Sequence, residues 1–135
     1  MKISSPDFDK EIPSKFTCDG EDIPPVLNID SIPENTKTLA MIMDDPDAKG
    51  WVHWVEYNIP VGSPLQKGEQ GMNSWPTNGY KGPCPPSGTH RYVFKVYALG
   101  TELNLPEDTT SKDLLKAMES HILAKAELVA TYSRQ

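Results

Sequence analysis

The stretch LAMIMDDPDAKGWVHWVEYNIP, residues 39–60, contains two apolar runs joined by an acidic turn. Large apolar residues occupy alternate positions from Leu39 to Met43, and Asp45 continues the same alternation. In a strand these residues share one face, so a carboxylate stands at the end of an apolar face. Pro46 keeps the preceding residue extended and ends ladder pairing. The stretch therefore predicts two antiparallel strands, with Asp45 at the rim where the first strand becomes a loop.

The second run, residues 51–59, predicts the returning strand. Regular alternation places Trp51, His53 and Val55 on one side and the even-numbered residues, including Trp54, on the other. If the two runs pair, Asp45 and His53 meet across the rim. Taken alone, the two residues are more typical of a turn-stabilising aspartate and a half-buried, hydrogen-bonded histidine.

The whole chain of 135 residues fits a single domain, residues 1–135. Its net charge of −6 argues against nucleic acid as a partner, because nucleic-acid binders present a basic face. No stretch approaches the roughly 18 apolar residues of a membrane span. The first residues also lack the basic and apolar regions of a signal peptide. We therefore expect no membrane span and a cytoplasmic location.

The two cysteines, Cys18 and Cys84, show neither a zinc spacing nor a disulfide framework. Buried or free thiols are the expectation, and a bridge between them stays open for oxidising or very hot surroundings. No motif for a cofactor is present, so none is expected.

Residues 1–36 and 61–88 are rich in turn-forming residues. The first segment alternates short extended pieces with Pro and Asp-Gly turns, which predicts short edge strands. The second is a Gly- and Pro-rich connection whose length is typical of functional or disordered loops. Because it contains Trp75 and Tyr80, we expect a long ordered loop with a function.

A third strand is expected from His90 onward, where alternation is clear. One face carries His90, Tyr92, Phe94, Val96 and Ala98. A second histidine therefore stands at the start of a strand, on the core-facing side.

The segment from Thr110 to about Tyr132 predicts one amphipathic helix. Apolar residues recur there at three- and four-residue spacing, namely Leu115, Met118, Ile122, Ala126 and Val129. Thr110 or Ser111 is suited to cap its start, and Asp113 complements the helix dipole.

Asp45, His53 and His90 have the chemistry of a small anion site. A carboxylate beside an imidazole favours the charged imidazolium, which holds phosphate or carboxylate. Asp45 would repel an anion on direct contact, so it is expected behind the imidazoles. The same three residues could act as acid and base in a hydrolase, but no nucleophile motif accompanies them. They also lack the close spacing of a metal site, so no metal is expected.

Two segments resemble the phosphatidylethanolamine-binding proteins, also called Raf kinase inhibitor-like proteins, and in particular their short prokaryotic branch. DDPDAKGWVHW, residues 44–54, resembles the first family signature, and GPCPPSGTHRYVFKVYAL, residues 82–99, resembles the second. The early CDGEDIPPVL and the final SHILAKAELVATYSR are similar to prokaryotic members as well. The resemblance covers nearly the whole chain.

The resemblance implies a mostly β protein: an antiparallel β-sandwich with a Greek-key element, a long ordered loop and a C-terminal α-helix. It also implies a small-anion cavity at one rim, formed by Asp45, Asp47, Trp51, His53, Gly82, Pro83, His90 and Tyr92. Members of the family are binding and regulatory proteins rather than enzymes, and some inhibit serine proteases. An inhibitory loop would lie within residues 62–88. The oligomeric state stays open, a homodimer included.

Overall fold

The computed structural model describes residues 1–62 and 67–134. Its strands are β1 (Lys2–Ser4), β2 (Asn28–Asp30), β3 (Thr38–Asp45), β4 (Trp51–Pro60), β5 (Glu69–Gln70), β6 (Thr89–Leu99) and β7 (Ile122–Ser133). Its helices are the α-helix α1 (Ser111–Met118) and the short 3-10 helices η1 (Ser14–Phe16) and η2 (Pro46–Ala48). Strands β5-β4-β3-β6-β7 form an antiparallel sheet in that order, and β1 pairs with β2 in a smaller sheet.

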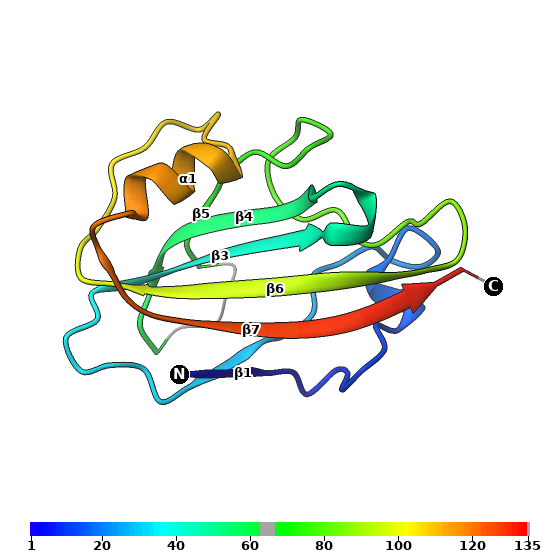
Figure 1. Cartoon of the computed structure of the whole chain (residues 1–135), viewed down its shortest axis with the longest axis horizontal. Helices are drawn as coiled ribbons and strands as arrows, with labels where there is room; N and C mark the ends of the chain where they lie inside the picture. The colour runs from blue at the N-terminus through cyan, green and yellow to red at the C-terminus, as the bar shows by residue number, and fades with distance from the viewer. Residues whose placement is uncertain (63–66, 135) are drawn as a thin grey trace.

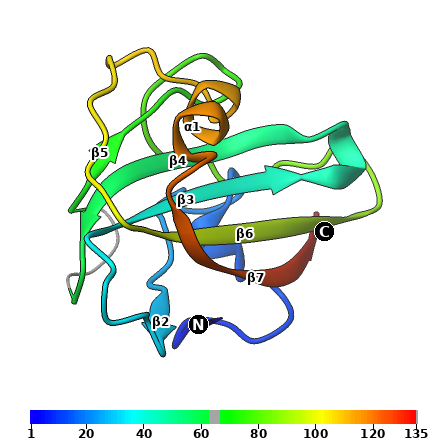
Figure 2. The same cartoon turned by 60° about the vertical axis from the view of Figure 1, so that its left-hand side comes forward.

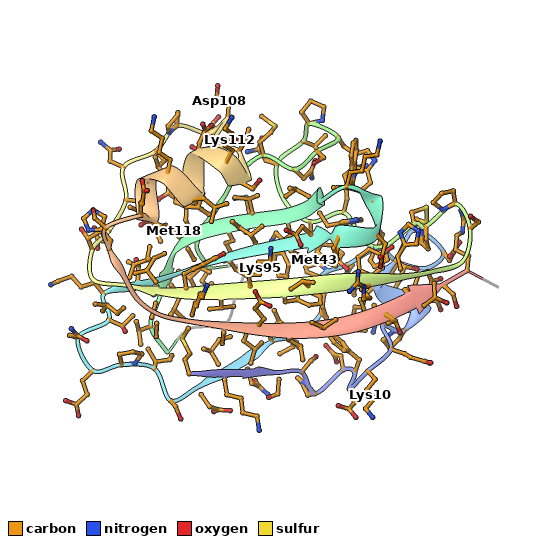
Figure 3. All side chains as sticks on the ribbon, in the orientation of Figure 1. Lys10, Met43, Lys95, Asp108, Lys112 and Met118 are labelled. Carbon is orange, nitrogen blue, oxygen red and sulfur yellow. A yellow bond between two sulfur atoms is a disulfide. The ribbon has the colours of Figure 1, made fainter. Side chains whose placement is uncertain are left out.

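The five-stranded sheet has an apolar core on each face. Leu39, Met41 and Met43 of β3 pack towards β1 and β2, whereas Ala40 and Ile42 pack towards α1. Figures 1 and 2 show α1 on one side of the sheet and β1 on the other. In Figure 3, Met118 extends from the end of α1, and its side chain is fully buried in the second core. The predicted mostly β, antiparallel fold is confirmed, and the small sheet of β1 and β2 is consistent with the predicted sandwich.

β6 pairs with β3 and not with β4. Apart from the short β5, β4 is the strand of the large sheet that comes before β6 in the chain. The long connection from β4 returns the chain to the far side of β3, as connections do in Greek-key arrangements. The predicted alternation of β6 is confirmed, since Tyr92, Phe94, Val96 and Ala98 all lie in the core against β1 and β2.

A β-bulge interrupts the pairing of β3 with β4 at His53. Met43 lies opposite Trp54 and Asp44 lies opposite Val52, so His53 is an extra residue in β4. A bulge of this kind redirects the side chains that follow it. Trp54 accordingly packs on the Met43 side, and Val55 packs on the other side. The strict alternation that we predicted for residues 51–59 is wrong after His53, since Tyr57 packs with Val55 on the α1 side.

The predicted helix from Thr110 to Tyr132 is correct only in its first third. Thr110 caps α1, as predicted, and it also forms a capping box with Asp113, but the helix ends at Met118. Residues 122–133 form β7, which pairs with β6 along nearly its whole length. A strand with a partner of that length gains ladder hydrogen bonds and core contacts that outweigh the helix preference of its alanines.

Cys18 and Cys84 form a disulfide, with their Cα atoms 5.5 Å apart. Our expectation of free or buried thiols is therefore wrong, and the alternative of a bridge is correct. The bond joins the segment after η1 to the loop before β6, across 66 residues of sequence. None of the helices described is long and apolar enough to span a membrane.

Candidate functional site

A cavity of about 100 Å³ opens at the end of the sheet where β3 ends and β4 and β6 begin. Its walls are Asp45, Ala48, Trp51, His53, Trp75, Cys84, Pro85, Pro86, His90 and Tyr92. Five of the eight residues predicted for the anion cavity therefore lie together. The rest of the wall comes from η2 and from the loop before β6.

Asp45 is the buried charge of this cavity, with 2% of its surface exposed. Its Oδ2 accepts a hydrogen bond from His90 Nδ1 at 2.6 Å, and its Oδ1 accepts the Asp47 backbone N–H at 2.8 Å. The second bond caps η2, so the carboxylate also shapes the turn between β3 and β4. In the ladder Asp45 lies opposite Trp51, and its direct imidazole partner is His90 rather than His53.

His53 is buried and hydrogen-bonded to the loop before β6. Its Nδ1 lies 2.7 Å from the carbonyl oxygen of Lys81, and a carbonyl only accepts, so Nδ1 carries the proton. Burial lowers the pKa of His53 below its ordinary value of 6.5, while the Lys81 carbonyl and Asp45 oppose that shift. The unfolded chain therefore binds this proton more tightly, and stability falls as the pH drops through 6.5. Near neutral pH, Nε2 of His53 is therefore the unprotonated ring nitrogen, which can accept a hydrogen bond.

His90 and Tyr92 complete the polar lining from β6. Because Nδ1 of His90 donates to Asp45, Nε2 is the ring nitrogen left for a ligand. The Tyr92 hydroxyl is fully buried and makes no well-formed hydrogen bond with the residues described, although the Asp45 carboxylate lies close to it. Burial and the nearby charge of Asp45 raise the pKa of Tyr92, so the hydroxyl stays protonated and is a donor.

Three predicted site residues lie outside the cavity wall. Asp47 turns towards Arg91, whose Nε and backbone N–H both donate to its Oδ2, and this holds the pKa of Asp47 at about 2. Gly82 and Pro83 are buried against the segment after η1. A Cβ on Gly82 would lie 2.1 Å from the Phe16 carbonyl oxygen, so this glycine allows a close backbone approach. These residues support the site from outside, and the ligand-binding role of the predicted set stays a prediction.

The loop before β6 contributes the residues that the sequence did not assign to the site. Pro85, Pro86 and Cys84 form one wall, and the disulfide ties this wall to Cys18. Trp75 packs edge-on against both His53 and Trp51, with ring centroids 5.0 and 5.5 Å apart. The presence of Trp75 in the predicted functional loop was the available signal that this residue belongs to the site. Nothing in the sequence predicted its contact with His53.

Side-chain hydrogen bonds hold the described part of the long loop, residues 61–88, in agreement with the prediction of an ordered loop. Oδ1 of Asn73 accepts the backbone N–H groups of Trp75 and Thr77, and its Nδ2 donates to the Gly79 carbonyl. Within the predicted inhibitory segment, residues 63–66 lie outside the described residues. No group of three or more His, Cys, Asp or Glu side chains in the part of the chain described could hold a metal ion.

Comparison with known proteins identifies the family. The family model described as phosphatidylethanolamine-binding protein matches residues 3–133. The chain belongs to this family. A protein of Methanothermobacter thermautotrophicus named UPF0098 is 49% identical over 137 residues, and the match covers 91% of each chain. A UPF0098 protein of Chlamydia muridarum is 42% identical, with 99% of each chain covered.

Solved structures agree with the fold. A phosphatidylethanolamine-binding protein homolog of Chlamydia trachomatis has a TM-score of 0.95 and 38% identity, with 99% of this chain and 97% of that chain covered. YbcL of E. coli, described as a member of the mammalian family, has a TM-score of 0.89 and 27% identity, with 99% of this chain and 98% of that chain covered.

Proposed function

We propose that this protein is a binding and regulatory protein for small anions, namely phosphate and phosphomonoesters, held in the cavity between β3, β4 and β6. One observation carries the proposal. The cavity gathers Nε2 of His53, Nε2 of His90 and the buried Tyr92 hydroxyl, and within residues 1–62 and 67–134 the Tyr92 hydroxyl makes no well-formed hydrogen bond. Buried polar groups are nearly always hydrogen-bonded, so an unpaired hydroxyl beside two imidazole rings favours a polar ligand.

The three groups suit a phosphate oxygen in different ways. His90, backed by the Asp45 carboxylate, donates from Nε2 when charged. The Tyr92 hydroxyl donates without any change of charge. Neutral His53 accepts from a protonated phosphate oxygen, and it becomes a donor once it takes up a proton. A monohydrogen phosphate group satisfies every one of them.

The cavity walls favour binding over covalent catalysis. Among the described residues that line the cavity there is no serine, threonine or lysine, and the sulfur of Cys84 is bonded to Cys18 in the disulfide. A cavity of about 100 Å³ is of a size that accepts a phosphate group. The remainder of a phosphomonoester would lie at the mouth of the cavity, beside the exposed rings of Trp51 and Trp75.

Phosphate is expected to raise the unfolding temperature of the protein. Stabilisation grows as RT ln(1 + [L]/Kd), which reaches about 2.7 kcal/mol when phosphate is 100-fold above Kd. We expect His53→Ala and His90→Ala to remove most of this shift. His121→Ala provides the matched control, because His121 is exposed between α1 and β7 and does not line the cavity. Thermal unfolding with phosphate, and with chloride at equal ionic strength, measures the effect.

The increase in unfolding temperature caused by phosphate is expected to depend on pH. Burial lowers the pKa of His53, and an anion favours its charged form, so phosphate binding takes up a proton. The shift is therefore expected to be larger at about pH 6 than at about pH 8. No shift at millimolar phosphate at either pH, or an equal loss in the His121 variant, would contradict the proposed site.

Two finer expectations stay predictions. The first is inhibition of serine proteases through the loop within residues 62–88, of which residues 63–66 are not described. An assay for saturable inhibition of chymotrypsin-like enzymes tests this expectation.

The second is the cytoplasmic location, which has to be compared with the presence of the disulfide. Stable disulfides are typical of oxidising compartments and of the cytoplasm of hyperthermophiles. Fractionation of the source cells, with trapping of free thiols, tests the location and the redox state together.

A further inference from the structure

Two lysines stand just outside the walls of the cavity, and neither has a carboxylate partner. Lys49 is the C-cap of η2, between the wall residues Ala48 and Trp51. Lys81 lies on the loop before β6, where its backbone N–H donates to the His53 carbonyl at 3.0 Å and its carbonyl accepts from His53 Nδ1 at 2.7 Å. Within residues 1–62 and 67–134, neither ammonium group forms an ion pair. Two positive charges are therefore held beside the cavity and remain available to a ligand.

The turn that carries Lys49 is closed onto the cavity and leaves the lysine in solvent. Lys49 has a φ of 57°, in the left-handed region, and the N–H of Gly50 donates to the Asp45 carbonyl at 2.9 Å. The backbone of the turn is thereby fixed next to the residue whose carboxylate lines the cavity. Because Lys49 is exposed and its four-carbon stem is flexible, its ammonium group is free to approach a group bound at the mouth.

The ammonium group of Lys81 lies over the ring of Trp75, 5.7 Å from the ring centroid. The same ring packs against His53, with the two centroids 5.0 Å apart. One aromatic ring therefore separates this ammonium group from an imidazole of the cavity. A cation over an exposed ring is held weakly, and Trp75 is 36% exposed. Lys81 can therefore leave the ring for an anion that a bound phosphomonoester brings to the mouth.

The carboxylates around the mouth already have other partners. Each accepts a hydrogen bond, and the pairs are Asp45 with His90, Asp47 with Arg91, and Asp22 with the Gly82 N–H. The Arg91 charge is neutralised in its pair with Asp47, so the positive charge left at the mouth is that of the two lysines. With a net charge of −6 the chain as a whole repels anions, and attraction at the mouth has to be local.

We infer that the ligand of this cavity carries a second negative group beyond its phosphate, and that Lys49 and Lys81 bind this group at the mouth. The inference rests on the proposed function, because a phosphate seated between the two histidines leaves the rest of the ligand beside Trp51 and Trp75. The ligand class is then a small phosphorylated acid, with a carboxylate or a second phosphate at its outer end. A neutral or cationic outer end would leave both ammonium groups without a partner.

A matched series of ligands tests the second negative group. Glycerol 3-phosphate and 3-phosphoglycerate have the same three-carbon skeleton, and a carboxylate in the second replaces a hydroxymethyl group in the first. Glycerol 1,3-bisphosphate supplies a second phosphate on that skeleton. Titration calorimetry at low ionic strength is expected to show that one or both of the doubly anionic ligands bind about tenfold more tightly than glycerol 3-phosphate. The difference should shrink as salt is added, because exposed charges are screened.

A pair of neutral substitutions tests the two lysines. Lys49→Gln with Lys81→Gln is expected to reduce the tenfold preference to about twofold or less. Lys112→Gln with Lys116→Gln is the matched control, because it makes the same change of charge at exposed positions on α1 that do not line the cavity. Figure 3 labels Lys112 on this helix. The control should keep the preference, and circular dichroism checks that both double variants are folded.

Three results would overturn the inference and leave the anion cavity intact. Glycerol 3-phosphate could bind as tightly as both doubly anionic ligands, or the preference could survive the loss of Lys49 and Lys81. Phosphoethanolamine, whose outer end is a cation, could bind more tightly than 3-phosphoglycerate, a result that would assign the mouth to the faces of Trp51 and Trp75. In all three cases inorganic phosphate still binds. Absence of binding by inorganic phosphate and by every ester would instead contradict the proposed function, and the inference with it.

Discussion

Removal of the Cys18–Cys84 disulfide is expected to lower the free energy of unfolding by about 4 kcal/mol. The bond closes a loop across 66 residues, and a cross-link of that span removes much of the chain entropy of the unfolded state. The double variant Cys18→Ser with Cys84→Ser, unfolded in urea, measures the difference. Wild-type protein reduced with a dithiol is the control and should match the variant.

The loss is expected to concern stability rather than the shape of the site. Three hydrogen bonds still hold the loop before β6 onto the segment after η1: Tyr80 Oη to the Phe16 carbonyl, Cys18 N–H to the Pro83 carbonyl, and Gly82 N–H to Asp22 Oδ1. The folded variant should therefore still be stabilised by phosphate. Unfolding within about 1 kcal/mol of the oxidised wild type would contradict the expected role of the bond.

Asp45→Ala is expected to lower the free energy of unfolding by about 3 kcal/mol. The change removes a buried carboxylate that accepts from His90 and from the Asp47 backbone N–H. Both donors lose their partner, and a small void remains. The variant should also lose stabilisation by phosphate, because the hydrogen bond that orients the His90 ring is lost.

Asp44→Ala is the matched control, one residue earlier on β3. Asp44 bonds to Lys95 on the opposite face, and both side chains are partly exposed. Exposed ion pairs contribute about 0–1 kcal/mol, so this variant should be almost as stable as wild type and should keep its response to phosphate. Equal losses in the two variants would indicate that Asp45 has no special part in the site.

Alternation in the sequence predicted the central strands well because both are long and have one fully apolar face. On β6 it placed His90 and Tyr92 on the inner face, and on β3 it placed Asp45 at the rim; the structure has all three there. The pairing of Asp45 with His90 rather than His53 was not predictable. It depends on β6 returning beside β3, which is a property of the topology and not of either strand.

The bulge at His53 and the strand β7 were missed for different reasons. A bulge inserts one residue without any change in the residue types, so an alternating pattern read from the sequence continues across it without a visible break. In the last segment, Ile122, Ala126 and Val129 fit a helical period, but Ala124, Ala126, Leu128, Ala130 and Tyr132 fit a strand period equally well. The pairing with β6 decided between them.

The wall of the cavity was the least predictable part of the site. Trp75, Pro85 and Pro86 come from a loop whose path is fixed by the Asn73 hydrogen bonds and by the disulfide. Two cysteines 66 residues apart carry no pattern from which a bridge could be inferred. Contacts of this kind depend on the whole fold, because neither partner is near the other in sequence.

The most direct test of the anion site is the imidazole nitrogen NMR spectrum with and without phosphate. The chain has three histidines, so each can be assigned from one variant. Without phosphate, we expect His53 in the form protonated at Nδ1, as its bond to the Lys81 carbonyl requires. With phosphate, Nε2 of His53 and of His90 should shift, and both nitrogens of His121 should stay unchanged. Phosphate that leaves His53 and His90 unchanged, or that shifts all three alike, would contradict the site.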